Sequence, residues 1–260
     1  MTGDAFIVLG TPSEEQLQCD NHDHRSCYGY NSKACQERAA DYWRSSNVMK
    51  VFNSRLKRLR LQWMRTPQPG KKLLVLDIDH TIYDCTNMLK ESLHDSCRIR
   101  PHLSTMFSSL KEYYDYCLWS QTAWQWIETK CSLIGIYESC QSYPLFILDR
   151  SNMFSVGKSS NDQAVEPAAG EIVEVVRRNV KCLRLIWDSC PELYSEKNTL
   201  HIDDLHKNFG LNPKNGILVS PYRKANYDTD TELLKLTQYL LRVAKLDDVT
   251  TMDHSTWKNT

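Results

Sequence analysis

The sequence predicts an α/β fold, in which a parallel, Rossmann-like sheet is flanked by helices. Short apolar runs alternate with helical patterns from residue 71 to residue 250, and strands that alternate with helices form parallel sheets. The run at 73–76 is apolar at every position, as expected for a central strand that is covered on both faces. With 41% hydrophobic and 25% charged residues, the chain of 260 residues also has the composition of a globular protein.

Four parts can be distinguished along the chain. They are an irregular segment with cysteine and histidine, a helix and linker, the main α/β domain and a tail: residues 1–41, 42–70, 71–250 and 251–260. The ten cysteines include no C-x-x-C pair and follow no secretory signal, which favours reduced thiols inside the cell.

Cysteine and histidine gather in the first part, and both residue types bind zinc. Their spacing matches none of the usual zinc-finger patterns. We therefore favour a polar tail and keep a zinc site as the alternative. The residues concerned are Cys19, His22, His24, Cys27 and Cys35.

Each element of the first half is predicted by a local pattern. A helix is expected at 42–64, because apolar residues recur there mostly at spacings of three and four, before a Pro-Gln-Pro-Gly turn. The apolar run at 73–76 is the first strand of the sheet. Pro101 opens the next helix, since proline is tolerated in the first turn. A strand at 114–119 and a helix at 122–133 follow.

The second half continues the alternation. We expect a loop at 157–170, because this stretch is small, polar and contains proline. Asp228 and Asp230 cap a last helix, whose apolar residues again have helical spacing. The remaining short apolar runs are predicted as strands, at 145–148, 183–187, 200–202 and 217–219.

Two aspartates follow the first strand directly, Asp77 and Asp79, with one residue between them. In open α/β sheets, ligands bind beyond the carboxyl ends of the strands. Two neighbouring carboxylates there repel each other unless a cation is present, and Mg²⁺ is the usual choice beside phosphate. One carboxylate can then attack phosphorus while the other handles the proton of the leaving oxygen. Alone, however, such a short pattern more often marks a strand end and a helix cap.

Three further sites stand beside predicted strands. Ser120 ends the second strand, Lys181 precedes a short apolar run, and Asp203 with Asp204 ends another. Each has an ordinary alternative: a helix-capping serine, a surface lysine and a solvated turn. In this order they are more specific, because hydroxyl, lysine and carboxylates would meet at one edge of the sheet. Other basic residues could take the place of Lys181, namely Lys158, Arg177 and Arg178.

These four sites resemble the four motifs of the haloacid-dehalogenase superfamily, and more closely its D-x-D-x-T phosphatases of the FCP/SCP type. Those enzymes act on the C-terminal domain (CTD) of RNA polymerase II. Arg100-Pro101 resembles their Arg-Pro element. Segments 71–79, 126–130 and 233–240 are similar to the CTD phosphatases that contain a ubiquitin-like domain, and the likeness runs from about residue 48 to 257.

The resemblance implies a haloacid-dehalogenase-like fold and a Mg²⁺-dependent protein serine/threonine phosphatase. It implies that Asp77 is the nucleophile that forms an aspartyl-phosphate, and that Asp79 is first the general acid and then the general base. Ser120 and Lys181 would hold the phosphoryl group. The implied Mg²⁺ ligands are Asp77, Asp79 (through its backbone carbonyl), Asp203 and Asp204. The stretch at 84–98 is too short for a large cap domain, so we expect an open site suited to a phosphoprotein.

Two other functions stay open. One is a non-catalytic interaction protein that keeps the phosphatase fold, and the other is a small-metabolite phosphatase of the same superfamily. The resemblance implies nuclear phosphoserine and phosphothreonine proteins as substrates, either the RNA polymerase II CTD or proteasome subunits.

The resemblance also implies the proteasome as a partner through a ubiquitin-like domain. Residues 6–13 resemble only the last strand of such a domain, and we interpret 1–41 as its remnant, which weakens the expectation of docking. We expect neither nucleic acid nor a membrane as partner, because 32 basic and 32 acidic residues balance and the apolar runs are short. The expected location is the nucleus, with the cytoplasm as a candidate additional location.

Overall fold

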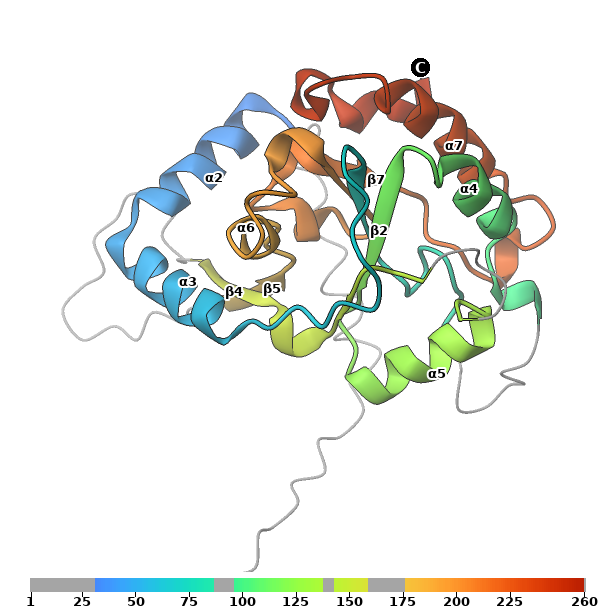
Figure 1. The fold of residues 1–260 in the computed structure, drawn as a ribbon, viewed down its shortest axis with the longest axis horizontal. Helices are drawn as coiled ribbons and strands as arrows, with labels where there is room; N and C mark the ends of the chain where they lie inside the picture. Colours follow the sequence, from blue (N-terminus) through green and yellow to red (C-terminus); the bar gives the residue numbers. More distant parts are fainter. Residues whose placement is uncertain (1–30, 87–95, 138–142, 159–175, 260) are drawn as a thin grey trace, which may run out of the picture.

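A five-stranded parallel sheet forms the centre of the computed structural model, which describes residues 31–86, 96–137, 143–158 and 176–259. Its strand order is β3-β2-β1-β6-β7, and every neighbouring pair is parallel. The strands are β1 (Lys72–Leu76), β2 (Tyr114–Trp119), β3 (Ile147–Leu148), β6 (Thr199–Asp203) and β7 (Gly216–Leu218). The sheet is flanked by helices, which confirms the predicted fold class (Figure 1).

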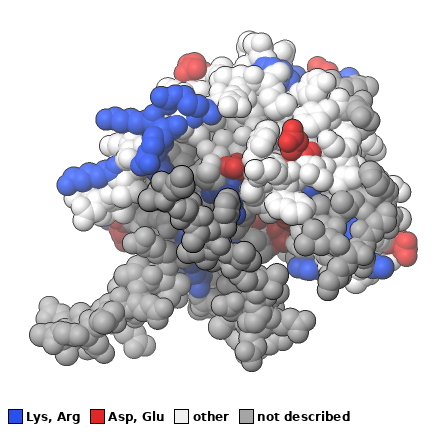
Figure 2. Space-filling view, turned by 90° about the horizontal axis from the view of Figure 1, so that it is seen from below, with Lys and Arg blue, Asp and Glu red and all other residues white. Residues whose placement is uncertain are grey.

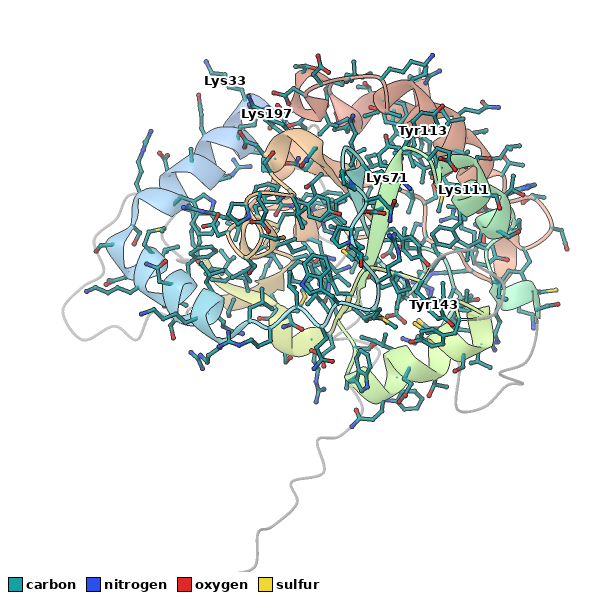
Figure 3. All side chains as sticks on the ribbon, viewed as in Figure 1. Lys33, Lys71, Lys111, Tyr113, Tyr143 and Lys197 are labelled. Carbon is teal, nitrogen blue, oxygen red and sulfur yellow. The ribbon has the colours of Figure 1, made fainter. Side chains whose placement is uncertain are left out.

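Helices cover both faces of this sheet. The first face packs against α4 (Leu103–Leu110), α5 (Trp124–Ile134) and α7 (Glu232–Val243), and the second against α6 (Arg184–Trp187). Within β1, Leu74 and Leu76 belong to the first apolar cluster, whereas Leu73 and Val75 belong to the second. Side chains fill the space on both sides of the sheet (Figure 3). This double burial explains why the strand is apolar at every position.

A two-stranded antiparallel sheet lies outside the main one. It pairs β4 (Phe154–Lys158) with β5 (Val176–Val180), and the chain then continues into Lys181. The loop predicted at 157–170 therefore begins inside a strand, and its part beyond residue 158 lies outside the described residues. No pattern in the sequence separated this hairpin from its surroundings.

The strand predicted at 183–187 is wrong, because this segment forms the short helix α6. Leu183, Ile186 and Cys190 are spaced three and four apart, and all three pack into the second apolar cluster. That spacing places them on one face of a helix, but the apolar run was too short for its period to be recognised.

The helix predicted at 42–64 is instead two helices, α2 (Lys33–Arg44) and α3 (Ser46–Arg58), separated at Ser45, whose backbone is extended. Segment 1–41 is thus not irregular throughout: Ser32 caps α2 by accepting a hydrogen bond from the backbone N–H of Cys35 at 3.3 Å. Beyond α3, Leu59 and Leu61 both pack against the second cluster, and their spacing of two requires extended chain. The cysteines and histidines at 19–27 lie outside the described residues.

Two smaller boundaries also differ. Helix α4 begins at Leu103 rather than Pro101, after His102 with a φ of 67°. In the tail predicted at 251–260, the described residues 251–259 are ordered, because a 3-10 segment (His254–Asn259) buries Trp257, whose Nε1 donates to the carbonyl of Leu218 at 2.8 Å. This segment therefore packs with the main domain. Among the described helices, none has the length and apolar character needed to cross a bilayer.

Candidate active site

The residues singled out in the sequence meet at the carboxyl edge of the parallel sheet. Asp77 follows β1, and its N–H donates to the carbonyl of Ile202 on β6 at 3.0 Å. Ser120 follows β2, and Asp203 and Asp204 lie at the end of β6. The parallel registers align these strand ends, so carboxylates more than a hundred residues apart become neighbours.

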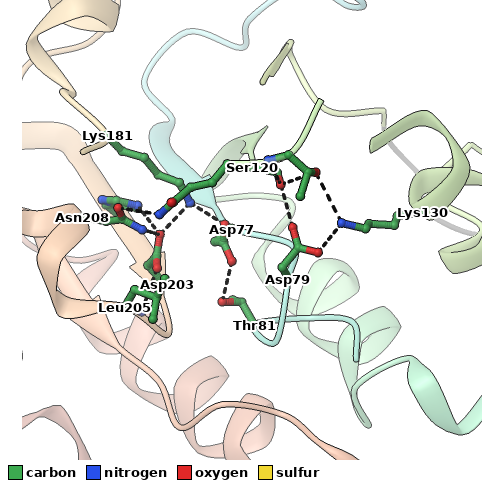
Figure 4. A network of polar contacts seen from close by, with 12 residues as sticks. Asp77, Asp79, Thr81, Ser120, Lys130, Lys181, Asp203, Leu205 and Asn208 are labelled. Carbon is green, nitrogen blue, oxygen red and sulfur yellow. Dashed lines mark hydrogen bonds and ion pairs between the residues drawn. The ribbon is translucent and has the colours of Figure 1, made fainter. Parts of the chain in front are cut away.

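Asp77 is held from two sides. Lys181 Nζ donates to its Oδ1 at 2.5 Å, and the Thr81 hydroxyl donates to its Oδ2 at 3.0 Å (Figure 4). Only 4% of Asp77 is exposed. Burial raises its pKa well above the usual range, Lys181 opposes this, and the neighbouring carboxylates raise the pKa further. The Thr81 hydroxyl thus holds the side of the Asp77 carboxylate that faces away from Lys181.

Asp203 is the most heavily hydrogen-bonded carboxylate of the site. Its Oδ2 accepts from Lys181 Nζ at 2.6 Å, Asn208 Nδ2 at 2.8 Å and His201 Nε2 at 3.2 Å, and its Oδ1 accepts from the N–H of Leu205 at 2.8 Å. Burial would raise its pKa, but Lys181 and His201 outweigh this and hold the pKa far below the usual range. Asp203 therefore stays charged and fixes Lys181 against Asp77.

Asp204, which follows Asp203 in sequence, differs from it sharply in hydrogen bonding and in pKa. Asp204 accepts no hydrogen bond from any other side chain in the described part of the chain, and burial, then Asp203, raises its pKa to about 7. Carboxylate oxygens of Asp77, Asp203 and Asp204 lie within 4.8 Å of one another. Three carboxylates face a single lysine, so the site carries an excess of negative charge. An all-oxygen donor set with this charge fits a hard divalent cation such as Mg²⁺.

Asp79 lies on the other side of Asp77 and has its own partners. Ser120 Oγ donates to its Oδ2 at 2.7 Å, and Lys130 forms an ion pair with its Oδ1. Burial would raise the pKa of Asp79, but Lys130 and Ser120 together lower it below its usual range. Figure 4 shows this group beside the Asp77–Lys181–Asp203 group.

Lys130 was missed as a site residue. It is only 2% exposed, and it lies on α5 among the buried residues Ile127, Cys131 and Ile134. A lysine at helical spacing within an apolar helix face is the signal that could have revealed it, because a buried lysine needs an anionic partner.

The structure distinguishes Lys181 from the other basic residues that the sequence left open for its place. Lys181 reaches Asp77, whereas Arg178 is exposed on β5. The side chains of Lys158 and Arg177 lie outside those described. Lys181 follows β5 of the small hairpin and not a strand of the main sheet, which corrects the expected position of this site.

The part of the chain that contains these residues is similar to known proteins. The model of the NLI interacting factor-like phosphatases matches residues 72–250. The ubiquitin-like domain-containing CTD phosphatase 1 proteins of Bos taurus and Homo sapiens are each 38% identical over 223 residues. These alignments cover 83% of this chain and 63% of each relative, so the chain spans less than two thirds of the length of those relatives.

Solved structures give a weaker likeness. The Fcp1 structure described as an essential RNA polymerase II CTD phosphatase has a TM-score of 0.42 and 15% identity, covering 76% of this chain and 65% of that one. The family match extends over more than half of the chain and contains every site residue described above. The chain belongs to the NLI interacting factor-like phosphatase family.

Proposed function

We propose that the chain is a Mg²⁺-dependent protein serine/threonine phosphatase that acts through an aspartyl-phosphate on Asp77. The observation that carries this proposal is the convergence at one sheet edge of Asp77, its lysine partner Lys181 and the Asp79–Ser120 pair. Phosphoryl transfer depends mainly on positioning and on neutralising charge around phosphorus. This edge provides an oriented carboxylate, a fixed cation and a second carboxylate.

In the first step, the Asp77 carboxylate attacks phosphorus and the bond from phosphorus to the serine or threonine oxygen breaks. Asp79 gives its proton to that leaving oxygen. Ser120 Oγ donates to Asp79 in the structure. When substrate is bound, this hydroxyl can donate its hydrogen bond to a phosphoryl oxygen instead. Asp79 then loses one of the contacts that stabilise its charged form.

In the second step, water attacks the phosphorus of the aspartyl-phosphate, and the bond from phosphorus to Asp77 breaks. Asp79, now a carboxylate, takes the proton of the water, and inorganic phosphate leaves. Lys181 stays against Asp77 because Asp203 holds its other side at 2.6 Å. The same lysine can therefore neutralise phosphoryl charge in both steps.

Asp77, the Asp79 backbone carbonyl and Asp204 would hold Mg²⁺, and Asp203 would contribute an oxygen or act by fixing Lys181. When bound, the ion neutralises negative charge on the phosphoryl oxygens and on the carboxylates.

The expected substrates are phosphoserine and phosphothreonine residues of nuclear proteins. The curated relatives are named CTD phosphatases, which favours the RNA polymerase II CTD as the first candidate substrate. Proteasome subunits are the second candidate substrates, with the proteasome as a partner and the nucleus as the location.

Asp77→Asn tests the proposal with p-nitrophenyl phosphate and a phosphoserine peptide. Turnover should be abolished, because an amide cannot form the acyl phosphate. The melting temperature should not fall, because the change removes a buried charge that lies among other carboxylates. Asp188→Asn, at an exposed aspartate paired with Arg184, is the matched control and should keep full turnover.

Three results would contradict this function. They are Asp77→Asn turnover within about tenfold of the wild type, turnover that survives chelation, and faster hydrolysis of sugar phosphates than of phosphopeptides. Binding of phosphopeptide without any turnover in Mg²⁺ would instead establish a non-catalytic interaction protein.

A further inference from the structure

Positive charge is concentrated in one stretch of this neutral chain. Between Asp41 and Asp77 there are nine lysine and arginine residues and no aspartate or glutamate, although the whole chain has 32 of each sign. Five of the nine lie on α3 and directly after it: Lys50, Arg55, Lys57, Arg58 and Arg60. We call these five residues, together with the exposed Arg150, the basic surface.

The inner face of α3 fixes this surface in place. Phe52 is fully buried and packs against Phe154 of β4, with ring centroids 6.3 Å apart. Phe154 pairs in register with Val180, the residue before Lys181. Helix α3 is therefore anchored on the hairpin that delivers Lys181 to the candidate active site.

The cations on and directly after α3 form no ion pairs with residues that the structure describes. Arg65 and Arg100, by contrast, are paired with Asp115 and Asp230. Lys57 and Arg58 are exposed. Unpaired like charges on one helix destabilise it slightly, and they attract anions from solution.

This surface begins at the edge of the sheet where the candidate active site lies. Arg55 Nη1 donates to the carbonyl of Ser151 at 3.0 Å, in the turn that follows β3. The N–H of Arg150, in the same turn, donates to the carbonyl of Thr122 at 3.0 Å, and the Thr122 hydroxyl lies 2.9 Å from Ser120 Oγ. Hydrogen bonds through Thr122 thus connect the turn that Arg55 contacts with Ser120, the serine proposed to bind phosphate. Figure 2 views the molecule from below Figure 1 and shows lysine and arginine gathered toward the side on which α3 lies.

A depression of about 210 Å³ lies within the basic surface. It is lined by Arg55, Arg58, Leu59, Ser151, Asn152 and Leu185. Arg55 uses only Nη1 in hydrogen bonds to described residues, and Arg58 uses Nε and Nη2, so N–H groups of both guanidiniums stay available. Two guanidiniums beside a polar turn suit a phosphate or carboxylate group. The lining contains no aromatic ring on which a nucleotide base could stack.

We propose that the basic surface binds acidic or phosphorylated residues of the protein substrate that flank the phosphoserine being hydrolysed. This rests on the proposed function, because it assigns a substrate class to the same site: acidic or multiply phosphorylated segments. The candidate active site and the basic surface thus have different roles. The sheet edge acts on one phosphoryl group, and α3 holds the chain that carries it.

Arg55→Glu/Arg58→Glu tests the proposal against Lys235→Glu/Lys245→Glu, a matched pair of exposed residues on and after α7 with the same change in net charge. The substrates are p-nitrophenyl phosphate and two phosphoserine peptides, one with neutral flanks and one with glutamate or a second phosphoserine. The wild type should have a lower KM for the acidic peptide, and this advantage should disappear in high salt. The α3 variant should raise that KM about tenfold and leave p-nitrophenyl phosphate turnover unchanged.

Lys57→Gln/Arg58→Gln is a second, milder variant, for use if the first is unstable. It keeps the hydrogen bond from Arg55 to the Ser151 carbonyl. It should raise the same KM to a smaller extent. Equal KM values for the two peptides in the wild type would overturn the inference, as would an equal rise in the α7 control. So would binding of RNA or of phosphatidylserine vesicles that the acidic peptide cannot displace.

The inference and the proposed function fail in different ways. Absence of p-nitrophenyl phosphate turnover in the wild type counts against the phosphatase. Fluorescence anisotropy of the acidic peptide still tests the basic surface in that case, because binding weakened only by the α3 variants would support it.

Discussion

At the scale of single residues, the protonation of Asp79 is the central question of the site. As the proposed general acid, Asp79 must carry a proton when the leaving oxygen departs, yet Lys130 and Ser120 both stabilise its charged form. Ser120 can turn its hydroxyl toward a phosphoryl oxygen, but Lys130 is buried and has no comparable alternative among the contacts it makes. Lys130 therefore sets how readily Asp79 takes up and gives away its proton.

Lys130→Met tests this role. The ion pair lowers the pKa of Asp79, so its removal raises that pKa and keeps the acid form to higher pH. In the pH profile of kcat/KM, the alkaline limb at which Asp79 loses its proton should move to higher pH. Lys130→Arg retains the positive charge and should keep the limb near its wild-type position. Identical limbs in the Met variant and the wild type would show that Lys130 does not control Asp79.

At the scale of elements, the strands and helices that the sequence predicted correctly are those whose own residues show how they are buried. Strand β2 was predicted at 114–119 and is observed as Tyr114–Trp119, because a strand buried on both faces is read from its own residues. The hairpin β4–β5 and the break at Ser45 depend on contacts between distant segments, such as Phe52 with Phe154. Such contacts leave no periodic pattern in either segment.

The residues of the candidate site also fall into those that the sequence could predict and those that it could not. Asp77, Asp79, Ser120 and the Asp203–Asp204 pair could be located because each directly ends or follows a strand of the main sheet. Lys130 was not located, because it reaches Asp79 from the middle of a helix 51 residues away in sequence, and only its place on an apolar helix face marks it. Lys181 was located, although the strand thought to follow it is a helix.

Arg100 joins the turn of the candidate active site to helix α7, and Arg100→Lys tests this link. Its Nη1 donates to the carbonyl of Thr81 at 2.9 Å, and Nε and Nη2 donate to both oxygens of Asp230 at 3.0 and 2.8 Å. Asp230 in turn caps α7 through the N–H of Glu232. Lysine cannot make this fork of hydrogen bonds, so the variant leaves buried acceptors unpaired and should lose about 3 kcal/mol of unfolding free energy in urea.

The control for Arg100→Lys is Arg44→Lys. Arg44 also pairs with an aspartate, Asp41, but the two side chains are 78% and 65% exposed. Its replacement should change the unfolding free energy by less than about 0.5 kcal/mol. A similar loss in both variants would show that the buried link has no special role in joining the turn to α7.

At the scale of the whole molecule, folding gathers several carboxylates at one place, and a bound cation would balance their negative charge. Asp77, Asp203 and Asp204 come from strand ends far apart in sequence, and one lysine faces all three. Because the folded state raises the pKa of Asp204 to about 7, the cation-free protein should lose stability as pH rises through that value. A bound divalent ion reverses this penalty by favouring the charged form.

Magnesium should therefore raise the melting temperature in a way that depends on pH. At a Mg²⁺ concentration ten times its Kd, the stabilisation is about 1.4 kcal/mol, or roughly 3–6 °C for a domain of this size. The rise should be larger at pH 8 than at pH 6, because protons compete for Asp204 below about pH 7. Asp204→Asn should reduce the rise at both pH values, while Asp247→Asn, at an exposed aspartate after α7, should leave it unchanged. A magnesium effect equal at pH 6 and pH 8, or equal in Asp204→Asn and the wild type, would place the ion elsewhere.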